Sequence, residues 1–224
     1  MNETKRLGRG LEALLGPTSR EQAEASGALR EVAVGAIAPN PFQPRRNFDE
    51  AGLVELAASI QSSGLLQPII VRAVGARFEL IAGERRWRAV QRLGWSKVPA
   101  IVRDFDDRTV LSLALIENLQ RDDLSALDAA QGYERLVTEF KLSASEVARL
   151  VGKDRSTIAN TLRLLKLPVD VQEMMQAGKL SEGHGRALLA VADQREMSRL
   201  AKSAAEQGWS VREVEAIVRG EAPA

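Results

Sequence analysis

Hydrophobic positions in the first half of the chain alternate between two spacings. Short runs rich in Val and Ile, typical of strands, alternate with segments whose apolar residues recur every three or four positions, as in helices. The predicted strands lie at residues 31–37, 67–74, 77–83 and 98–103. The predicted helices, each followed by a glycine, lie at residues 49–63 and 84–93. This pattern predicts a small α/β domain over residues 31–104.

Strand patterns stop after residue 104, and only helical spacing follows. The predicted helices lie at residues 108–120, 125–140, 144–150, 156–164, 169–176, 182–192 and 211–219. Capping-box patterns, in which a serine is followed three positions later by an acidic residue, begin at Ser125 and Ser210. The chain is therefore predicted to be an α+β protein with an all-helical domain over residues 105–224.

The first thirty residues follow neither pattern. Leucines at helical spacing and a basic start predict an amphipathic helix over residues 5–16, which is too short to be stable alone in water. We expect it either to fray or to dock onto another surface. Residues 17–30 are small and polar without an apolar period, and are predicted to be a flexible linker.

Composition removes several kinds of chemistry. The 224 residues include no Cys and one His, which excludes disulfides, thiol nucleophiles, Cys-ligated metals and His-rich zinc sites. No apolar run is long enough to cross a membrane, and the N-terminus has no apolar core of a signal peptide. With 45% hydrophobic residues the chain can bury a core, and we expect a soluble cytoplasmic protein.

A net charge of +1 conceals two oppositely charged blocks. Residues 83–103 hold six basic residues and one acidic residue, whereas residues 104–128 hold seven acidic and two basic ones. Two solvated faces would explain these blocks, and so would a site for a polyphosphate and a metal ion. Composition leaves both interpretations open.

Residues 142–167 match the spacing of a helix-turn-helix. Ala148 allows close approach of two helices, Gly152 permits a turn with positive φ, and Ile158 anchors the second helix. That helix would present side chains that can bond base edges and phosphates: Arg155, Ser156, Thr157, Asn160 and Arg163. A plain helical hairpin with a polar face is the alternative, and the three spacing positions favour DNA binding.

Residues 80–89, LIAGERRWRA, predict a strand that meets a helix at Gly83. A helix N-terminus offers free N–H groups to a phosphate, and glycine lets the phosphate approach the backbone. Arg85 and Arg86 add two guanidinium groups that match phosphate oxygens. An exposed ion pair between Glu84 and Arg88 is an alternative use of this segment.

Three further segments carry weaker signals. In residues 117–124, Glu117 and Asn118 are adjacent oxygen ligands of the kind that Mg²⁺ accepts, and Arg121 follows one turn later. A helical Glu117–Arg121 ion pair explains this segment equally well. Residues 40–45 and 64–69 are Gln-Pro loops, which by themselves indicate ordinary turns.

The chain resembles the ParB family of chromosome and plasmid partition proteins in the order of its motifs. These are residues 40–45, 64–69, 80–89 and 117–124, then the helix-turn-helix, then LSEGHGRALL at residues 180–189. The resemblance covers residues 31–219 and implies a ParB/sulfiredoxin-like fold for residues 31–104. The leading LGRGLEALLG resembles the family's N-terminal peptide, which engages the ATPase ParA. The residues implied in that contact are Lys5, Arg6, Leu7, Arg9 and Leu11.

The resemblance implies that the N-terminal domain binds CTP with Mg²⁺. The implied nucleotide ligands are Gly64, Leu65, Leu66, Gln67, Pro68, Ile69, Gly83, Glu84, Arg85, Arg86, Asn118 and Arg121. Glu117 and Asn118 would hold the metal, and Gln43, Glu84 and Glu117 would serve hydrolysis. Because no His or Cys lies near these motifs as a general base, hydrolysis of CTP to CDP and phosphate should be slow, with CTP serving mainly as a switch.

The resemblance also implies a dimeric clamp that loads at a parS site, closes its N-terminal gate with CTP and slides onto flanking DNA in the nucleoid. The implied DNA-binding residues are Lys153, Arg155, Ser156, Thr157, Asn160, Arg163, His184 and Arg186, although His184 suits a helix cap equally well. The family's DLSPLEEA is DLSALDAA here. We expect the chain to lack the family's C-terminal dimerisation domain. A nucleoid-occlusion homologue and a nucleotide-independent helix-turn-helix regulator are the alternatives.

Overall fold

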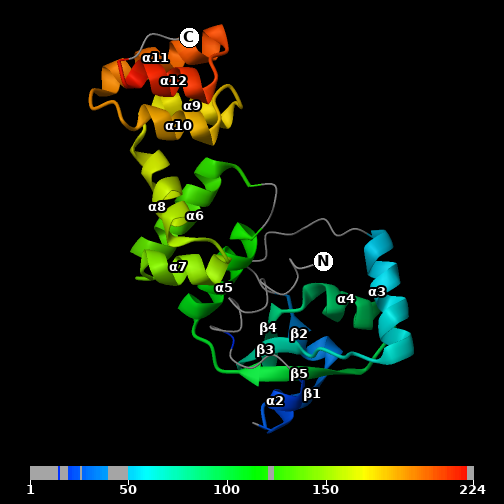
Figure 1. Cartoon of the computed structure of the whole chain (residues 1–224). Coiled ribbons are helices and arrows are strands. Elements are labelled where there is room, and N and C mark those ends of the chain that lie inside the picture. The colour runs from blue at the N-terminus through cyan, green and yellow to red at the C-terminus, as the bar shows by residue number, and fades with distance from the viewer. Residues whose placement is uncertain (1–14, 16–19, 26, 40–49, 121–123, 221–224) are drawn as a thin grey trace. The chain divides into compact units, whose positions relative to one another are not determined.

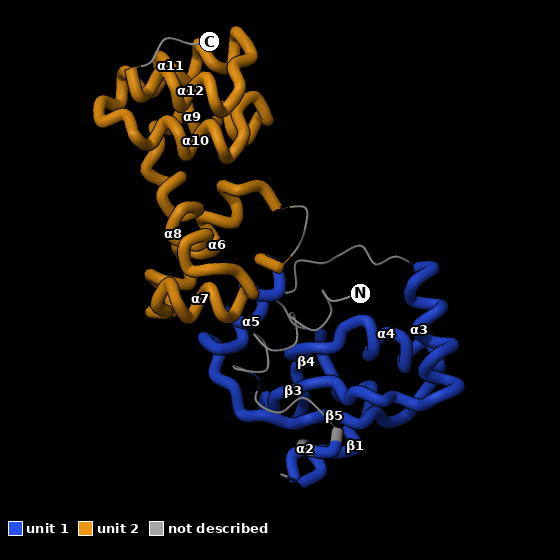
Figure 2. Tube along the Cα trace, viewed as in Figure 1, with its two compact units in different colours: residues 1–118 blue, residues 119–224 orange. Residues whose placement is uncertain are grey.

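The computed structural model describes residues 15, 20–25, 27–39, 50–120 and 124–220 (Figure 1). The chain divides into an N-terminal unit, residues 1–118, and a C-terminal unit, residues 119–224 (Figure 2). This division lies later than the predicted boundary at residue 104, because the helix that follows the last strand packs on the sheet.

The N-terminal unit contains a five-stranded sheet in the order β1-β5-β3-β4-β2. Its strands are β1 (Leu29–Ala33), β2 (Ile37–Ala38), β3 (Ile69–Val74), β4 (Arg77–Ala82) and β5 (Lys97–Arg103). The pairs β1–β5 and β3–β4 are antiparallel, and β2–β4 and β3–β5 are parallel. The single strand predicted over 31–37 is divided by a 3₁₀ turn, η1 (Val34–Ala36).

Helices cover both faces of this sheet. α3 (Glu50–Ser63) and α4 (Glu84–Arg92) pack against the face that carries Ile69 and Val71 (Figure 1). The intervening Ile70 points to the other face and packs with Leu113 of α5 (Asp107–Leu119). A short helix, α2 (Arg20–Ala25), lies within the predicted linker.

The C-terminal unit is helical, as predicted. Its helices are α6 (Ala126–Thr138), α7 (Ala144–Val151), α8 (Arg155–Arg163), η2 (Leu164–Lys166), α9 (Val169–Gln176), α10 (Glu182–Leu188), α11 (Gln194–Gln207) and α12 (Val211–Val218). The side chains of Ser125 and Ser210 cap α6 and α12 as their sequence patterns predict. α11 was not among the predicted helices.

Gly183 in α10 marks a close approach to the start of α12. A Cβ at this position would lie 2.8 Å from Cγ2 and 3.3 Å from Cγ1 of Val211, whose branched side chain has little freedom to turn away. We expect Gly183→Ala to lower the free energy of unfolding, because overpacking costs about 1–3 kcal/mol while the helical preference of alanine returns about 1 kcal/mol.

Urea unfolding of the Gly183→Ala, Val211→Ala and double variants measures this effect. If the contact is responsible, the double variant loses less stability than the sum of the two single variants. Additive losses would mean that Gly183 serves something other than this helix contact.

Candidate functional site

α7 and α8 form the predicted helix-turn-helix. Ala148 and Ile158 are 5% and 0% exposed, so both helices bury the positions that the spacing indicated. Gly152 ends α7 with a φ of 71°, and Lys153 N donates to Ala148 O at 3.0 Å. A branched side chain would be strained at this φ, so the glycine is a requirement of the turn.

The outer side of α8 is rich in donors. Arg155, Ser156, Thr157 and Arg163 are exposed and Asn160 is half-buried, whereas Thr161 and Ile158 face inward. Within the part of the chain that the structure describes, Arg155 and Arg163 form no ion pair. An exposed row of guanidinium, hydroxyl and amide groups on a second helix suits base edges and phosphates in a major groove.

His184 and Arg186 lie on α10. Ser181 N donates to Nδ1 of His184 at 3.0 Å, and Nε2 lies 2.9 Å from the carbonyl of Trp209, so Nε2 carries the proton. His184 therefore caps α10 and ties it to the segment before α12. A DNA contact by His184 would require breaking one of these bonds. Arg186 is exposed, with its guanidinium 4.0 Å from Glu182.

The junction between β4 and α4 has the geometry of a phosphate cradle. Gly83 precedes α4 with a φ of 102°, a left-handed conformation that favours glycine. A Cβ at Gly83 would lie 3.0 Å from Cγ2 of Ile69 and 3.2 Å from Nη2 of Arg86. The glycine therefore lets Ile69 and the Arg86 guanidinium pack closely against the N-terminus of α4.

Arg85 and Arg86 brace this cradle against two other segments. Arg85 Nη2 donates to Gly52 O of α3 at 3.1 Å. Arg86 Nη1 donates to Gln67 O at 2.7 Å and to Pro68 O at 2.6 Å, and its burial lowers the pKa of the guanidinium. Both arginines are predicted phosphate ligands, whereas the contact of Arg86 with the 64–69 loop was not predicted from the sequence.

The 64–69 loop contributes mostly backbone to this site. Leu65, Pro68 and Ile69 are buried, and Leu65 and Ile69 belong to the core, so their side chains support the loop. Leu66 is 76% exposed, Gln67 is exposed, and Gly64 turns the chain out of α3 with a φ of 73°. A ligand would therefore meet the loop's backbone groups and the side chains of Leu66 and Gln67.

Glu84 begins α4 as a buried carboxylate. Its exposed fraction is 7%, and Oε1 accepts from Arg88 Nε at 2.8 Å. The ion pair predicted as the alternative is therefore present, but Glu84 is buried and not exposed as predicted. Within the described residues Oε2 has no hydrogen-bond partner. A buried acceptor without a partner is costly, so this oxygen is suited to receive a hydrogen bond from a ligand or a water.

Glu117 and Asn118 follow each other in the last turn of α5, the first exposed and the second half-buried. The described residues contain no cluster of three acidic or histidine ligands that could hold a metal ion alone. Two adjacent oxygen ligands fit Mg²⁺, which keeps waters and takes its remaining ligands from phosphates. Gln43, Arg121 and the predicted ParA-contacting residues 5–11 lie outside the described residues.

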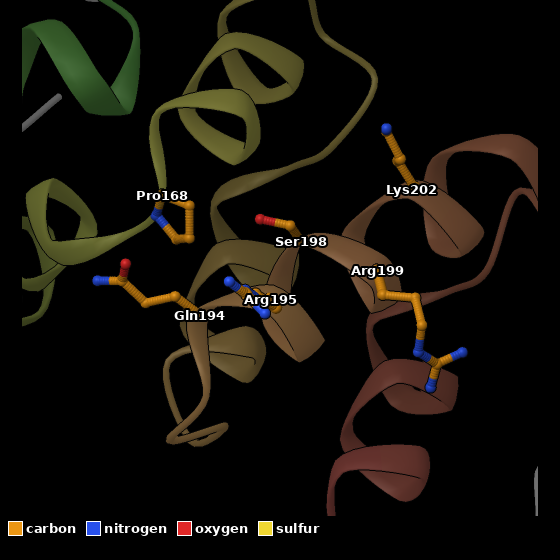
Figure 3. A pocket seen from close by; sticks show the side chains of 6 residues that line it. All are labelled: Pro168, Gln194, Arg195, Ser198, Arg199 and Lys202. Atoms are coloured by element: carbon orange, nitrogen blue, oxygen red, sulfur yellow. The ribbon is translucent and has the colours of Figure 1, made fainter.

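A further hollow of 510 Å³ lies between Pro168 and α11, lined by basic and polar side chains (Figure 3). One of its charges is already balanced, because Arg199 pairs with Glu196 at 2.6 Å. Ser198 donates a hydrogen bond to Asp170 at 2.9 Å. This hollow was not predicted from the sequence.

No described helix has the length and apolarity to span a membrane.

Comparison with known proteins matches both units. The ParB N-terminal domain model matches residues 18–119, and the ParB HTH domain model matches residues 122–222. A probable chromosome-partitioning protein ParB of Xylella fastidiosa is 49% identical over 218 residues, which cover 93% of this chain and 70% of that protein.

Two solved structures of C-terminally truncated ParB from Caulobacter crescentus are each 44% identical. The one complexed to the centromeric parS site has a TM-score of 0.69 and covers 85% of this chain and 99% of its own. The one complexed with CTP-γ-S has a TM-score of 0.38 and covers 78% of this chain and 97% of its own.

Proposed function

Because this chain belongs to the ParB family of chromosome-partitioning proteins, we propose that it binds a centromeric parS site and that CTP controls this binding as a switch. The observation that best supports sequence-specific DNA binding is that α8 has one buried face and an exposed polar face. Ile158 is fully buried, whereas Arg155 and Thr157 are exposed. The 44% identical Caulobacter protein, solved on parS, supports the same site for this chain.

The proposed nucleotide site is the cradle at Gly83. The N–H groups of the first turn of α4 would bind the triphosphate, with Arg85 and Arg86 neutralising its charge. The loop at residues 64–69 would contact the cytidine. Since Arg86 also holds two carbonyls of that loop, binding of phosphate at Arg86 is coupled to the position of the loop.

Glu117 and Asn118 are the proposed ligands of Mg²⁺, which would supply positive charge to the phosphates. Hydrolysis would be slow, because this chain offers a buried carboxylate, Glu84, and no imidazole at the cradle. We assign positioning of the attacking water to Glu84 or to Gln43. The clamp would form by dimerisation through the N-terminal units, slide onto flanking DNA, and engage ParA through residues 5–11.

Isothermal titration with CTP, ATP and GTP in Mg²⁺, combined with CTP turnover on parS and on scrambled DNA, tests this function. We expect selective binding of CTP and turnover that parS stimulates. Absence of CTP binding would leave a nucleotide-independent helix-turn-helix regulator. Binding of CTP with selectivity for a DNA site other than parS would indicate a nucleoid-occlusion homologue.

Glu117→Ala tests the metal ligands. We expect the Mg²⁺ concentration needed for half-maximal CTP binding to rise about tenfold or more, because one of two protein ligands is lost. CTP affinity in EDTA should stay at the wild-type value. Glu206→Ala, at an exposed position of α11, is the matched control. An unchanged Mg²⁺ dependence in Glu117→Ala would place the metal elsewhere.

A further inference from the structure

A charged pair is buried inside the sheet of the N-terminal unit. Arg72 on β3 and Glu79 on β4 are directly opposite each other and are 8% and 9% exposed. Arg72 donates from Nε at 3.0 Å and from Nη2 at 2.8 Å to the same oxygen, Oε2 of Glu79. Removing two charges from water costs several kcal/mol per ion, so such a pair is a weak source of stability and invites a different explanation.

The remaining donors of Arg72 reach the start of α5. Nη1 donates to the carbonyl of Phe105 at 3.1 Å, and Nη2 lies 2.7 Å from Oδ1 of Asp107, the first residue of the helix. Burial acts to lower the pKa of Arg72, but the hydrogen bonds and charges of Glu79 and Asp107 outweigh it and raise the pKa. One guanidinium therefore joins two strands to the first turn of α5.

Apolar packing alone would hold α5 less strictly. Leu113 packs with Ile70 and Ile101 under the sheet, but contacts of this kind are non-directional and let a helix slide or tilt. The four polar contacts of Arg72 have fixed directions, because the guanidinium is a rigid planar fork. The two contacts with Phe105 and Asp107 reach the start of α5, so they constrain where this helix leaves the sheet.

The far end of the same helix carries Glu117 and Asn118. Glu117 lies ten positions after Asp107, which is about 15 Å along a helix. A pivot of about 10° at the start of α5 would therefore move Glu117 by roughly 2–3 Å, whereas metal–ligand distances tolerate changes of about 0.2 Å. The angle of the helix decides whether these ligands can reach a metal.

We propose that Arg72 is a positioning residue for the metal–nucleotide site, acting through Asp107 and Phe105 to fix α5. This inference rests on the proposed function, since it concerns the Mg²⁺ ligands assigned there. Arg72 touches neither metal nor nucleotide in this role. The buried pair with Glu79 holds the guanidinium so that its outer donors face α5.

Asp107→Ala is the sharpest test, because this side chain is 87% exposed and its removal leaves Arg72 paired with Glu79. We expect the Mg²⁺ concentration for half-maximal CTP binding to the whole chain to rise about tenfold, as for loss of a group that orients a metal ligand. CTP affinity in EDTA and the melting temperature should stay close to wild type. Asp107→Glu should restore the wild-type Mg²⁺ dependence.

Asp104→Ala removes a nearby exposed carboxylate and is the control for a general change of charge. Arg72→Lys, which keeps the charge but loses the fork, should shift the Mg²⁺ dependence in the same direction as Asp107→Ala. Wild-type Mg²⁺ dependence in both variants, or an equal shift in Asp104→Ala, would overturn the inference. If the wild type binds no CTP, or Glu117→Ala leaves the Mg²⁺ dependence unchanged, the proposed metal site itself is wrong.

Discussion

Gly83→Ser is expected to abolish measurable CTP binding while leaving binding to parS DNA in the absence of CTP close to wild type. A serine Cβ would lie 3.0 Å from Ile69 and 3.2 Å from the Arg86 guanidinium, in the space where a phosphate would approach. The φ of 102° adds strain for any residue with a Cβ. Isothermal titration with CTP and Mg²⁺, together with fluorescence anisotropy on labelled parS, measures both properties.

Gly75→Ser provides a matched control for backbone strain. Gly75 lies in the turn between β3 and β4 with a φ of 59°, and a Cβ there would meet nothing within 4 Å. We expect this variant to keep its affinity for CTP. Loss of CTP binding in both variants would point to unfolding, and wild-type CTP affinity in Gly83→Ser would mean that the triphosphate lies elsewhere.

Arg155→Ala is expected to weaken parS binding by about 10- to 100-fold, which corresponds to 1–3 kcal/mol for one base contact by arginine. Arg155 begins α8, where a recognition helix meets base edges, and its side chain is exposed. CTP affinity measured without DNA should not change, since Arg155 is not part of the cradle. Anisotropy titrations on parS and on scrambled DNA at one fixed salt concentration separate specific from general loss.

Arg212→Ala, at an exposed position of α12, controls for the loss of one positive charge. If it weakens parS binding as much as Arg155→Ala, the effect is electrostatic and carries no base specificity. Unchanged parS affinity in Arg155→Ala would mean that α8 is not the recognition helix. An equal loss of affinity for parS and for scrambled DNA would mean that Arg155 contacts the phosphate backbone and not a base.

The helix-turn-helix could be predicted because its constraints are local. Ala148, Gly152 and Ile158 are close in sequence, and each is set by the contact between two consecutive helices. Ser125 and Ser210 were identified as caps for the same reason, since a cap and its partner lie three residues apart. All the residues that define such a motif lie within a short window of sequence, so the motif can be recognised there.

α11 carries the same local signals, although it was not among the predicted helices. Asp193 accepts from Glu196 N at 2.8 Å, and the buried Met197, Leu200 and Ala204 recur at helical spacing up to Gly208. Its many charged residues obscured the apolar stripe.

Other features depend on residues that are distant in sequence and could not be predicted. Arg86 donates to the carbonyls of Gln67 and Pro68, and Arg72 donates to the carbonyl of Phe105. In each case the two residues are distant in the sequence, and the pairing of strands brings them together. The ring of His184 was equally suited by sequence to a cap or to DNA. The carbonyl of Trp209, which accepts from its second nitrogen, follows in the sequence only after α11.

The contacts of Arg72 also determine where this protein can be truncated without losing the packing of its N-terminal unit. A fragment ending at Arg103 would contain every strand of the sheet, yet it would leave Arg72 without the Phe105 carbonyl and the Asp107 carboxylate. It would also uncover Ile70 and Ile101, which pack with Leu113. A fragment that keeps α5 to Leu119 retains these contacts. Nucleotide binding by the N-terminal unit alone should therefore be studied with this longer fragment.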